Sequence, residues 1–444
     1  MSSLFGTSGI RGSAKEFLTN QVCFDIGRAF GIFLKKHKQK GKIALGMDSR
    51  KSGPRIKNAF SLGIHREGFE ISDQGIAPVP AINYFLVANK TLTGSCMITG
   101  SHIRPDFNGF KFFAFKEEIL KKHEREIEKI YEKIKEEVPF KAKKIKLERD
   151  KEAIGHYMNL LFKLANPPYP KMKIALDTGN GCQAIIMPKV LKKIGFSVKN
   201  INISLRPEKF IARDTETKEA AEPLKKFMKN KKFDIGIAFD GDGDRVIFVD
   251  GKRNFIPGDY TGSLIGKYSK SKILVTPINT SQVVDYLNKK VIRTKVGSPY
   301  VVEAMKRNGA SFGFEANGGG ISKEIMMSRD GGSTAIKILN LIKKTEKSLE
   351  ELINSLPKFY LYRTKIDCPR ELNQKIIKSA KKRFKGIKIE EIDGLKIWLG
   401  KTSWVLFRPS SNAPEFRVFA EAKTREKAEK IGGEGIAFVE SFIN

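Results

Sequence analysis

The stretch Asp240-Gly241-Asp242-Gly243-Asp244-Arg245 places three carboxylates at alternate positions, directly after the apolar run 233–239. Alternation lets the three carboxylates converge on one hard cation, and the two glycines permit a bend that side chains would obstruct. Ligands that are all oxygen favour Mg²⁺ or Ca²⁺. The spacing excludes an EF-hand, because Arg245 stands where that loop needs glycine and Gly251 where it needs glutamate. We interpret the stretch as a catalytic Mg²⁺ loop; a solvated acidic turn is the alternative.

The size and composition predict a cytoplasmic protein of several domains. The chain has 444 residues, of which 40% are hydrophobic, enough to form more than one core. It contains no apolar run of about 18 residues, and its first residues, MSSLFGTSGIRG, lack the apolar core of a signal peptide. The cysteines lie far apart without a CxxC pair, which favours reduced thiols and argues against zinc; they are Cys23, Cys96, Cys182 and Cys368. We expect no membrane partner.

The formal net charge of +33 is extreme and would favour phosphorylated or nucleic acid partners. The lysines, however, are spread along the whole chain. A lysine-rich proteome produces the same composition, and abundant ion pairs would fit a heat-adapted source. Aromatic residues do not alternate with basic ones in the manner of nucleic acid binders, so no nucleic acid partner is expected. The charge could still help to draw a dianionic sugar phosphate into a cleft.

One pattern of strand, polar turn and amphipathic helix occurs three times, beginning at residues 42–50, 173–181 and 272–279. This is how an α/β unit reads in sequence. Each unit is followed by a second strand that ends in an unusual loop, at residues 99–109, 240–245 and 314–320. The pattern predicts three similar α/β domains with mixed sheets, each presenting one loop to a shared cleft.

Two further segments set the expected boundaries. Residues 117–138 carry apolar side chains at helical spacing and predict an amphipathic surface helix, followed by a charged connector at 141–151. Residues 366–444 have a different order of predicted elements: a helix, strands near residues 387, 397, 405 and 418, and a closing helix. This order predicts a small α+β domain. We therefore expect an α/β protein with domains at 1–150, 151–253, 254–364 and 365–444.

The loop after the apolar strand 96–98 places Ser101 and His102 beside Gly100. A serine next to glycine at a strand end is well exposed for nucleophilic chemistry. The loop lacks the GxSxG spacing of a hydrolase elbow, and an ordinary Ser-His turn is the alternative. Lys111 lies ten residues on, after Asn108-Gly109-Phe110, and would bring an amine close to the serine.

Two other loops have polar side chains suited to a sugar phosphate. Between Arg408 and Arg417 lie hydroxyl, amide and turn-forming residues that indicate a phosphate cradle, although an ordinary hairpin loop is the alternative. Glu315 and Asn317 begin a glycine-rich loop, and a carboxylate with an amide suits sugar hydroxyls.

The run Gly179-Asn180-Gly181-Cys182-Gln183-Ala184 fits the GxGxxA pattern of a dinucleotide-binding turn. Such a fold also needs an acidic residue about 20 positions on. Residues 196–207 contain neither Asp nor Glu, so NAD binding is disfavoured. The chain also lacks a GxxxxGK[ST] run, which disfavours a P-loop nucleotide enzyme.

Taken together and in this order, these loops resemble the α-D-phosphohexomutase family of phosphoglucomutases, phosphomannomutases and phosphoglucosamine mutases. Phe5-Gly6-Thr7-Ser8-Gly9-Ile10-Arg11-Gly12 matches the family's opening motif, and Thr99-Gly100-Ser101-His102 looks like its phosphoserine loop. The metal loop 240–245 matches without change. Residues 314–319 resemble the sugar-recognition loop and 408–417 the phosphate-binding loop, while 294–297 and 330–332 fit further family patterns. The resemblance covers nearly the whole chain.

The resemblance implies a heart-shaped enzyme with four domains around one central cleft. Ser101 would carry a phosphoryl group, with one Mg²⁺ held by Ser101, Asp240, Asp242 and Asp244 and a sugar 1,6-bisphosphate as intermediate and activator. Lys111 is the first candidate for general acid or base, and His102 the second. By the same resemblance, Glu315 and Asn317 would bind sugar hydroxyls, and the 408–417 loop would bind the unreactive phosphate. The full set of implied sugar-phosphate ligands is Arg11, Arg245, Lys295, Glu315, Asn317, Arg408, Ser410, Ser411, Asn412 and Arg417.

The chain departs from the family pattern at three places. Ile103-Arg104-Pro105 replaces the usual Asn-Pro after the Ser-His pair, which leaves the exact shape of the serine loop open. Ser411-Asn412-Ala413-Pro414 lacks the usual Thr and Glu, which leaves the phosphate affinity open. Glu315-Ala316-Asn317-Gly318 looks like the form in archaeal members, which are often broad in substrate.

We therefore expect phosphomannomutase and phosphoglucomutase activity first, and phosphoglucosamine mutase activity as the alternative. A noncatalytic relative that binds phosphosugars, and a nucleic acid binder, are two further hypotheses. The preferred hexose and the oligomeric state, monomer or homo-oligomer, stay open at this point, as does the phosphorylation of Ser101 in the isolated protein.

Overall fold

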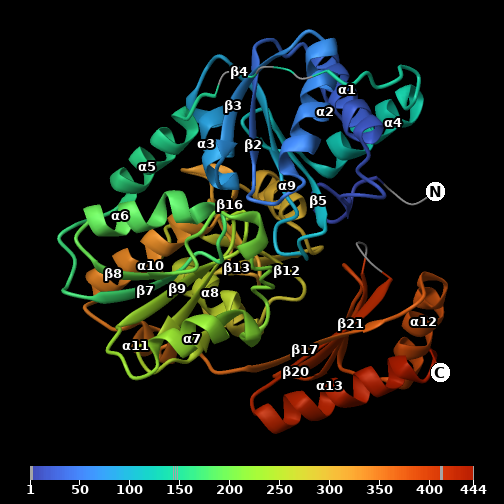
Figure 1. The fold of residues 1–444 in the computed structure, drawn as a ribbon. Helices are drawn as coiled ribbons and strands as arrows, with labels where there is room; N and C mark the ends of the chain where they lie inside the picture. Colours follow the sequence, from blue (N-terminus) through green and yellow to red (C-terminus); the bar gives the residue numbers. More distant parts are fainter. Residues whose placement is uncertain (1–3, 144, 146, 148, 411–413, 444) are drawn as a thin grey trace.

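The computed structural model describes residues 4–143, 145, 147, 149–410 and 414–443. The chain forms four successive parts, which Figure 1 colours from blue through green and yellow to red. The first part consists of β1 (Ile10–Ser13), α1 (Asn20–Lys36), β2 (Lys42–Met47), α2 (Gly53–Arg66), β3 (Glu70–Ile76), α3 (Val79–Ala88), β4 (Leu92–Ile98), β5 (Phe107–Ala114), β6 (Glu117–Glu118) and α4 (Lys121–Ile134).

The second and third parts follow the same plan of strands alternating with helices. The second contains α5 (Glu152–Leu164), β7 (Lys173–Asp177), α6 (Met187–Lys193), β8 (Ser197–Ile201), α7 (Glu222–Met228), β9 (Ile235–Phe239), β10 (Val246–Asp250) and β11 (Phe255–Ile256). The third contains α8 (Gly258–Tyr268), β12 (Ile273–Pro277), β13 (Lys290–Thr294), α9 (Ser298–Asn308), β14 (Phe312–Phe314), β15 (Gly320–Ser322), β16 (Met326–Asp330), α10 (Gly331–Thr345) and α11 (Leu349–Asn354).

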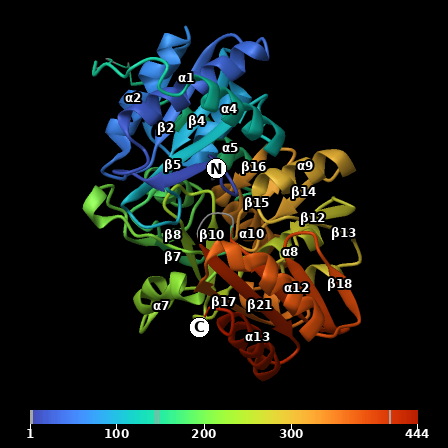
Figure 2. The same ribbon diagram turned by 90° about the vertical axis from the view of Figure 1, so that its right-hand side faces the viewer.

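The fourth part is an antiparallel sheet with two helices. It contains β17 (Tyr360–Asp367), α12 (Asn373–Arg383), β18 (Lys388–Glu390), β19 (Leu395–Gly400), β20 (Ser403–Pro409), β21 (Glu415–Ala422) and α13 (Arg425–Glu440). In Figures 1 and 2 this part lies at one side of the molecule, beside the third part, with α13 on its outer side. The α/β class and the α+β character of the C-terminal part are as predicted from the sequence.

Among the described residues the strands form three sheets, and one of them spans two parts. The second part has the order β11-β10-β9-β7-β8, and the fourth has β17-β21-β20-β19-β18. The first and third parts share an 11-stranded sheet, because β6 pairs in parallel with β16 at Glu117 and Met327. The sequence did not predict this junction, since a two-residue strand is too short to leave a pattern. The junction holds the first and third parts in a defined relative position.

The expected elements occur close to where the apolar patterns placed them. The strands expected at 42–45, 173–176 and 272–275 are β2, β7 and β12, and the helix expected within 117–138 is α4, with Ile127, Tyr131 and Ile134 buried. Strand β17 was not expected, because its side chains are only partly buried. All eight of its residues pair with β21, so the expected boundary between residues 364 and 365 falls inside this strand.

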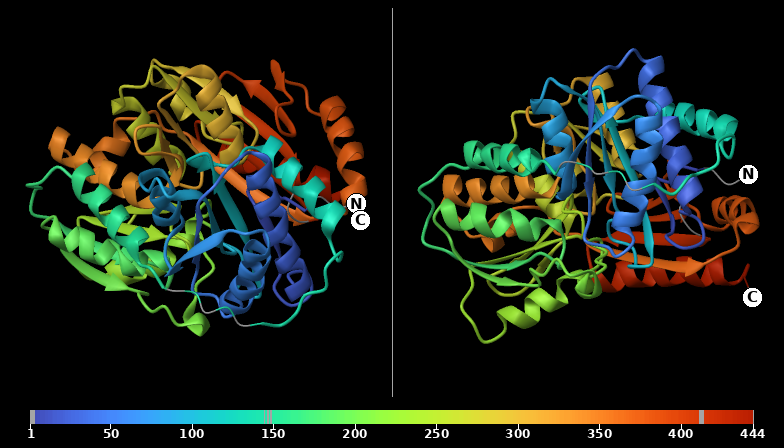
Figure 3. Two further views of the ribbon diagram at one scale, coloured as in Figure 1. Left: turned by 90° about the horizontal axis from the view of Figure 1, so that it is seen from above. Right: turned by 45° about the horizontal axis from the view of Figure 1, so that its top comes forward.

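A hydrophobic core that spans the second and third parts joins them. Phe239 and Val246 of the second part belong to the same buried cluster as Phe314 and Ile336 of the third. Helix α5 contributes Tyr157 to this cluster and lies beside α10, as Figures 1 and 3 show. No helix within the described ranges is both long and apolar enough to cross a membrane.

Buried polar contacts join the fourth part to the third. The Glu421 carboxylate accepts hydrogen bonds from the Ser281 hydroxyl, from the backbone and side-chain N–H groups of Gln282 at 3.0 Å, and from the Trp404 indole at 2.7 Å. Arg363 donates to Asp259 Oδ2 at 2.5 Å. Because a buried carboxylate is costly unless its hydrogen bonds are complete, these contacts define how the fourth part sits on the third.

Glu118 of β6 and Glu124 of α4 accept hydrogen bonds from the N-terminal motif, from one hydroxyl and one backbone N–H of that motif. Glu118 accepts from the Ser8 hydroxyl at 2.8 Å, and Glu124 accepts from the Gly9 N–H at 3.4 Å and from Lys121 Nζ at 2.5 Å. The helix predicted as a surface element therefore also supports the loop that carries Arg11.

The buried carboxyl of Glu124 should make stability depend on pH. Burial raises its pKa from 4.5 to about 7, so folding favours the protonated form. Stability from this group is complete below about pH 4.5 and declines as the pH rises to about 7. We expect urea unfolding of Glu124→Gln to lack this decline. Glu126→Gln is the control, because the contribution of Glu126 to stability changes with pH in the opposite direction. Burial raises the pKa of Glu126, but hydrogen bonds from Lys36 and His37 lower it overall. A parallel decline in wild type and Glu124→Gln would contradict the prediction.

Candidate functional site

Three loops that follow the carboxyl ends of strands supply most of the site. The loops begin at Thr99 after β4, at Asp240 after β9 and at Glu315 after β14, and each strand runs parallel to a neighbour in its sheet. Ligand sites in α/β sheets form at this end of the strands. The structure brings the three loops together: Ser101 contacts Asp240, and one arginine connects Asp244 with Glu315.

Ser101 is buried and has left-handed backbone geometry, with φ +52°. Its Oγ donates to Asp240 Oδ2 at 3.0 Å, and its N–H donates to the Thr99 hydroxyl at 2.7 Å. A serine with this backbone costs about 1–3 kcal/mol unless the surroundings enforce it. The strain and the contact with the acidic loop mark Ser101 as the residue that the fold positions for chemistry.

The guanidinium of Arg50 holds the serine loop in this shape. It is fully buried and donates to the backbone carbonyls of Ser101 at 3.0 Å, Ile103 at 2.6 Å, Arg104 at 2.6 Å and Phe107 at 3.0 Å. Its Nε donates to Asp48 at 3.0 Å. Sequence reasoning placed Asp48 and Arg50 in a polar turn and missed this role. The signal was their position after the first parallel strand, at the same edge of the sheet as Ser101.

The carboxylates of Asp240, Asp242 and Asp244 are buried and each offers an oxygen within 4.8 Å of the others. Gly243 has φ +73°, and a Cβ at Gly241 would lie 2.3 Å from the Phe210 ring and 2.9 Å from the Ser101 carbonyl oxygen. The two glycines therefore permit both the bend and the close approach of the two loops, as the alternating sequence predicted.

Burial makes this cluster electrostatically unfavourable without cations. Burial, with the charges of Asp242 and Asp244, raises the pKa of Asp240 well above its ordinary value. Burial also acts to raise the pKa of Asp244, but the cations of Arg329, Lys111 and Arg245 bring it below its ordinary value. The cluster thus needs positive charge to stay ionised.

The donor set fits a hard divalent cation. Oδ1 of Asp242 and Oδ1 of Asp244 are buried and have no hydrogen-bond partner among the described residues. Three carboxylates with unfilled oxygens suit Mg²⁺, which prefers oxygen ligands and keeps some of its waters. Ser101 Oγ, bonded to Asp240, lies where a serine-linked phosphate would add a further oxygen.

Lys111 and His102, the two expected acid–base groups, lie on either side of the acidic loop. Lys111 Nζ donates to Asp242 Oδ2 at 2.8 Å and to Asp244 Oδ2 at 2.6 Å. His102 Nδ1 lies 3.5 Å from Ser101 Oγ. Burial, together with the charges of Arg245 and Arg11, lowers the pKa of His102 well below its ordinary value, which favours the neutral imidazole.

Arg329 connects the 314–319 loop to the acidic loop 240–245, a connection that sequence reasoning missed. Its Nη1 donates to Glu315 Oε2 at 2.8 Å and its Nη2 donates to Asp244 Oδ2 at 2.8 Å. Asn317, also buried, accepts from the Gly319 N–H at 3.3 Å. The only hint of Arg329 in the sequence was its place just before the expected 330–332 motif.

Arg11 and Arg245 are both close to the acidic loop. Burial lowers the pKa of Arg11 to about 10, while Asp242 acts in the opposite direction. Arg245 Nε lies 3.9 Å from Asp240 Oδ2 and 3.8 Å from Asp244 Oδ1, too far for a hydrogen bond. This Nε has no hydrogen-bond partner within the described part of the chain and is free to meet a ligand.

Lys295 and Arg408 meet at a second place, in a pocket of about 390 Å³ between the first, third and fourth parts. Arg408 Nε donates to Asp393 at 2.7 Å, and Asp393 also accepts from the Val296 N–H at 2.9 Å. Arg417 lies opposite Arg408 across β20 and β21, and the Ser410 N–H donates to the Glu415 carbonyl. Ser411 and Asn412 lie outside the described residues.

The glycine loop that mimics a dinucleotide turn supports the metal loop instead. A Cβ on Gly181 would lie 2.5 Å from the Gly241 carbonyl oxygen, and the Cys182 N–H donates to that oxygen at 2.9 Å. Gly181 is therefore explained by the close approach of two loops of one sheet, and Gly179 by its left-handed backbone, with φ +60°.

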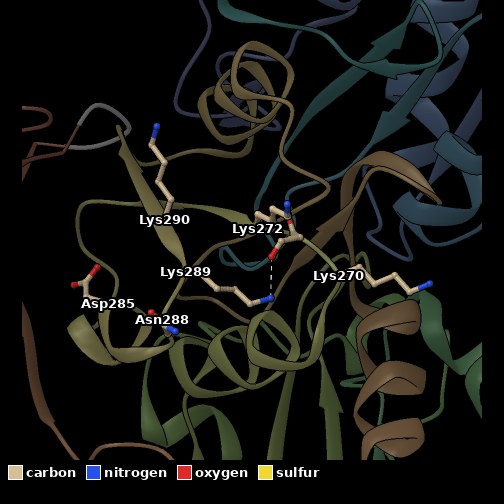
Figure 4. A pocket seen from close by; sticks show the side chains of 7 residues that line it. Lys270, Lys272, Asp285, Asn288, Lys289 and Lys290 are labelled. Atoms are coloured by element: carbon tan, nitrogen blue, oxygen red, sulfur yellow. Dashed lines mark hydrogen bonds between the residues drawn. The ribbon is translucent and has the colours of Figure 1, made fainter.

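Another surface pocket, of about 630 Å³, lies away from these residues. It lies in the third part and is lined by Lys270, Ser271, Lys272, Asp285, Asn288, Lys289 and Lys290. In Figure 4 the lysine side chains point in different directions, and Lys289 is bonded to the Ser271 carbonyl oxygen at 2.8 Å. Its cations do not converge on one point.

Comparison with known proteins identifies the family. Models of phosphoglucomutase/phosphomannomutase alpha/beta/alpha domains I, II and III match residues 2–138, 152–253 and 257–360. A "Phosphoglucomutase/phosphomannomutase" of Thermococcus kodakarensis is 35% identical over 469 residues, covering 100% of both chains. The chain belongs to the α-D-phosphohexomutase family. A "Probable phosphoglucosamine mutase" of Pyrococcus furiosus is 32% identical, covering 97% of this chain and 96% of the other.

Solved phosphohexomutase structures have the same fold. A phosphoglucomutase/phosphomannomutase family protein from Burkholderia thailandensis superposes with a TM-score of 0.83 at 22% identity, covering 99% of this chain and 97% of the other. An N-acetylphosphoglucosamine mutase of Aspergillus fumigatus, solved with GlcNAc-6P and magnesium, superposes with a TM-score of 0.66 at 14% identity, covering 99% and 95%. Like its relatives, this phosphohexomutase is an isomerase.

The role of Arg50 can be tested with a matched pair of variants. Arg50→Lys keeps the charge but cannot reach four carbonyls and Asp48, so we expect the free energy of unfolding to fall by about 3 kcal/mol and turnover by more than about tenfold. Arg55→Lys is the control, because Arg55 also bonds carbonyls of this part, at Ala14 and Leu18, away from the serine loop. Equal losses of turnover in the two variants, measured well below their melting temperatures, would contradict a specific role.

Proposed function

We propose that this phosphohexomutase interconverts the 1-phosphate and 6-phosphate of mannose and glucose, through a phosphoserine at Ser101 and a sugar 1,6-bisphosphate. The observation that supports this most directly is the 3.0 Å contact between Ser101 Oγ and Asp240, within a cluster of three buried carboxylates. A nucleophilic oxygen that is strained into place beside a cation site is the arrangement that phosphoryl transfer needs.

The phosphoryl group moves between Ser101 and the sugar in two matched steps. In the first, a sugar hydroxyl oxygen forms a bond to the phosphorus of phosphoserine, the bond from phosphorus to Ser101 Oγ breaks, and the hydroxyl proton passes to a protein base. In the second, the bisphosphate has turned over, Ser101 Oγ takes the other phosphoryl group, and the proton returns to the sugar. Lys111 and His102 are the candidate proton carriers, and His102 is the nearer to Ser101 Oγ.

Asp240, Asp242, Asp244 and the serine phosphate would together hold one Mg²⁺. The cation would supply positive charge opposite the phosphoryl oxygens, where charge accumulates during transfer. Arg329 and Lys111 supply the rest from the protein, at 2.8 Å and 2.6 Å from Asp244 Oδ2. These cations favour the ionised form of Asp244.

The remaining residues divide between the sugar and its unreactive phosphate. Glu315, held by Arg329 at 2.8 Å, and Asn317 would contact sugar hydroxyls. Arg11 and Arg245, which are close to the acidic loop, would contact the reacting phosphate. The unreactive phosphate would be held by Lys295, Arg408, Ser410, Ser411, Asn412 and Arg417. The bisphosphate binds in two orientations that exchange the positions of its two phosphates. The residues that contact the sugar and its phosphates must therefore accept the molecule in either orientation.

A phosphoglucosamine mutase is the alternative, favoured by the relative of that name from Pyrococcus furiosus at 32% identity. Sugars that differ at one hydroxyl are separated by one or two contacts, which makes substrate choice a matter for assay. A cytoplasmic location, the absence of nucleic acid and membrane partners, and activation by a sugar 1,6-bisphosphate remain predictions.

The mutase reaction can be followed directly by ³¹P NMR. With Mg²⁺ and trace glucose 1,6-bisphosphate, we expect mannose 1-phosphate and glucose 1-phosphate to give 6-phosphate signals, and glucosamine 1-phosphate to give one under the alternative. Ser101→Ala should lose at least about 10³-fold of this activity, because no other group can carry the phosphoryl.

Ser95→Ala is the matched control, since Ser95 is a buried serine on the adjoining strand whose hydroxyl has no hydrogen-bond partner among the described residues. Activity should survive that change. Conversion of none of the three sugars by the wild type would overturn the proposal and leave a noncatalytic phosphosugar binder.

Removal of the divalent cation should abolish turnover and lower stability together. We expect EDTA to stop the reaction and excess Mg²⁺ to restore it. Mg²⁺ should also raise the melting temperature of the wild type, because a ligand that binds only the folded state stabilises it. Asp242→Asn should lose this shift, whereas Asp106→Asn, an exposed residue paired with Arg104, should keep it. An equal shift in both variants would exclude the acidic loop as the cation site.

A further inference from the structure

The fourth part presents a row of cations on one face of its sheet. Arg408 pairs with Arg417 across β20 and β21, and Arg417 pairs with Lys365 across β21 and β17. Directly opposed residues of an antiparallel pair point to the same side, and so do residues two apart on one strand. Arg363, two residues from Lys365, therefore shares this face.

The opposite face of the sheet is the one that α13 covers. A Cβ on Gly435 of α13 would lie 2.8 Å from Val418 and 3.4 Å from Val405, two residues that alternate with those of the cationic face. The cations consequently point away from α13, toward the other parts of the molecule, as the position of β17, β20 and β21 above α13 in Figure 1 indicates.

Arg363 stands on this face with one end of its guanidinium fixed and the other unused. Nη2 donates to Asp259 of α8 at 2.5 Å, and the Asp259 Oδ1 in turn accepts from the Ser281 N–H at 2.8 Å. The side chain is only 12% exposed, and its Nε has no hydrogen-bond partner in the described chain. A buried donor left unpaired is costly, which indicates a missing acceptor.

Three further arginines have the same unfilled donor. The Nε atoms of Arg245, Arg329 and Arg417 are also buried and have no hydrogen-bond partner among the described residues. Burial raises the pKa of Glu216, as does Asp214, while the charges of Arg363, Arg417 and Arg245 oppose this shift, so all three arginines act on the same carboxylate. Yet Glu216 forms no ion pair within 4 Å with any of them, as far as the structure describes the chain.

We propose that Arg363 is a further phosphate-binding residue of the sugar-phosphate site, with Asp259 as its positioning residue. The inference rests on the proposed function. Arg363 lies two residues farther from the β20–β21 turn than Arg417 and contacts Asp259 of the third part, so it would lengthen the row of phosphate donors along this face. A bisphosphate that reorients in the site would keep one phosphate in contact with Arg408, Arg417 or Arg363.

The geometry requires arginine and not merely a positive charge. Nη2 alone donates to Asp259, which leaves the Nε–H for a phosphate oxygen, and lysine has a single ammonium that cannot occupy both places. Lys365, on the same strand, is different: its ammonium is 62% exposed and is paired with Glu415 at 2.8 Å. It provides a control for loss of charge without loss of a buried donor.

The test separates binding from turnover. Calorimetry would measure the binding of glucose 6-phosphate to the Ser101→Ala variant, which cannot turn the substrate over. The same measurement would be made on three double variants, in which Ser101→Ala is combined with Arg363→Lys, Arg363→Met or Lys365→Met. We expect either Arg363 change to raise the dissociation constant by at least about tenfold and Lys365→Met by less than about threefold. In the active enzyme Arg363→Lys should raise KM more than it lowers kcat. Asp259→Asn should weaken binding in the same direction, because Arg363 would lose its fixed orientation.

Melting temperatures distinguish a structural role. If Arg363→Met unfolds the fourth part, Arg363→Lys retains the charge and can still be assayed. Equal affinities in Arg363→Lys and Lys365→Met would overturn the proposal and leave Arg363 as an ion pair between the third and fourth parts. Binding without any wild-type turnover would contradict the mutase reaction while leaving the phosphate role of Arg363 intact, so the two failures are distinguishable.

Discussion

Three buried carboxylates within 4.8 Å of one another are the constraint on which the rest of this structure depends. Their mutual repulsion must be offset by cations, and no single segment of the chain provides them all. Lys111 comes from the first part, Arg245 from the second and Arg329 from the third. Burial strengthens every one of these interactions. The acidic loop therefore holds three parts of the molecule in register around one point.

The serine loop depends on a second buried charge. Arg50 fixes four backbone carbonyls around Ser101, and Asp48 fixes Arg50. The strained backbone of Ser101 is thus maintained by contacts that are themselves rigid, which keeps its hydroxyl against Asp240 without help from a ligand. The departure at Ile103-Arg104-Pro105 changes side chains, whereas Arg50 contacts this loop only through its backbone carbonyls, so these contacts do not depend on the substituted side chains.

The fourth part is attached differently, through side-chain contacts to the third part. Glu421 and Arg363 use partners at Ser281, Gln282 and Asp259, and its cationic sheet face is left with unpaired donors. An apolar cluster of Ile278 with Trp404, Leu406 and Phe419 adds to these contacts, so the position of the fourth part on the third is well defined.

The sequence by itself determined the α/β class, the three loops at strand ends and the candidate residues Ser101 and Asp240–Asp244. Alternating carboxylates, glycines and apolar strands are local patterns, and local geometry follows from them. Only the tertiary structure decided that Arg50 holds the serine loop, that Arg329 joins Glu315 to Asp244, that β6 and β16 join two sheets, and that Gly181 supports Gly241. Each depends on residues far apart in the chain that meet in a buried, low-dielectric environment. The role of a side chain in such an environment depends on which residues surround it in space, and a single sequence does not reveal these contacts.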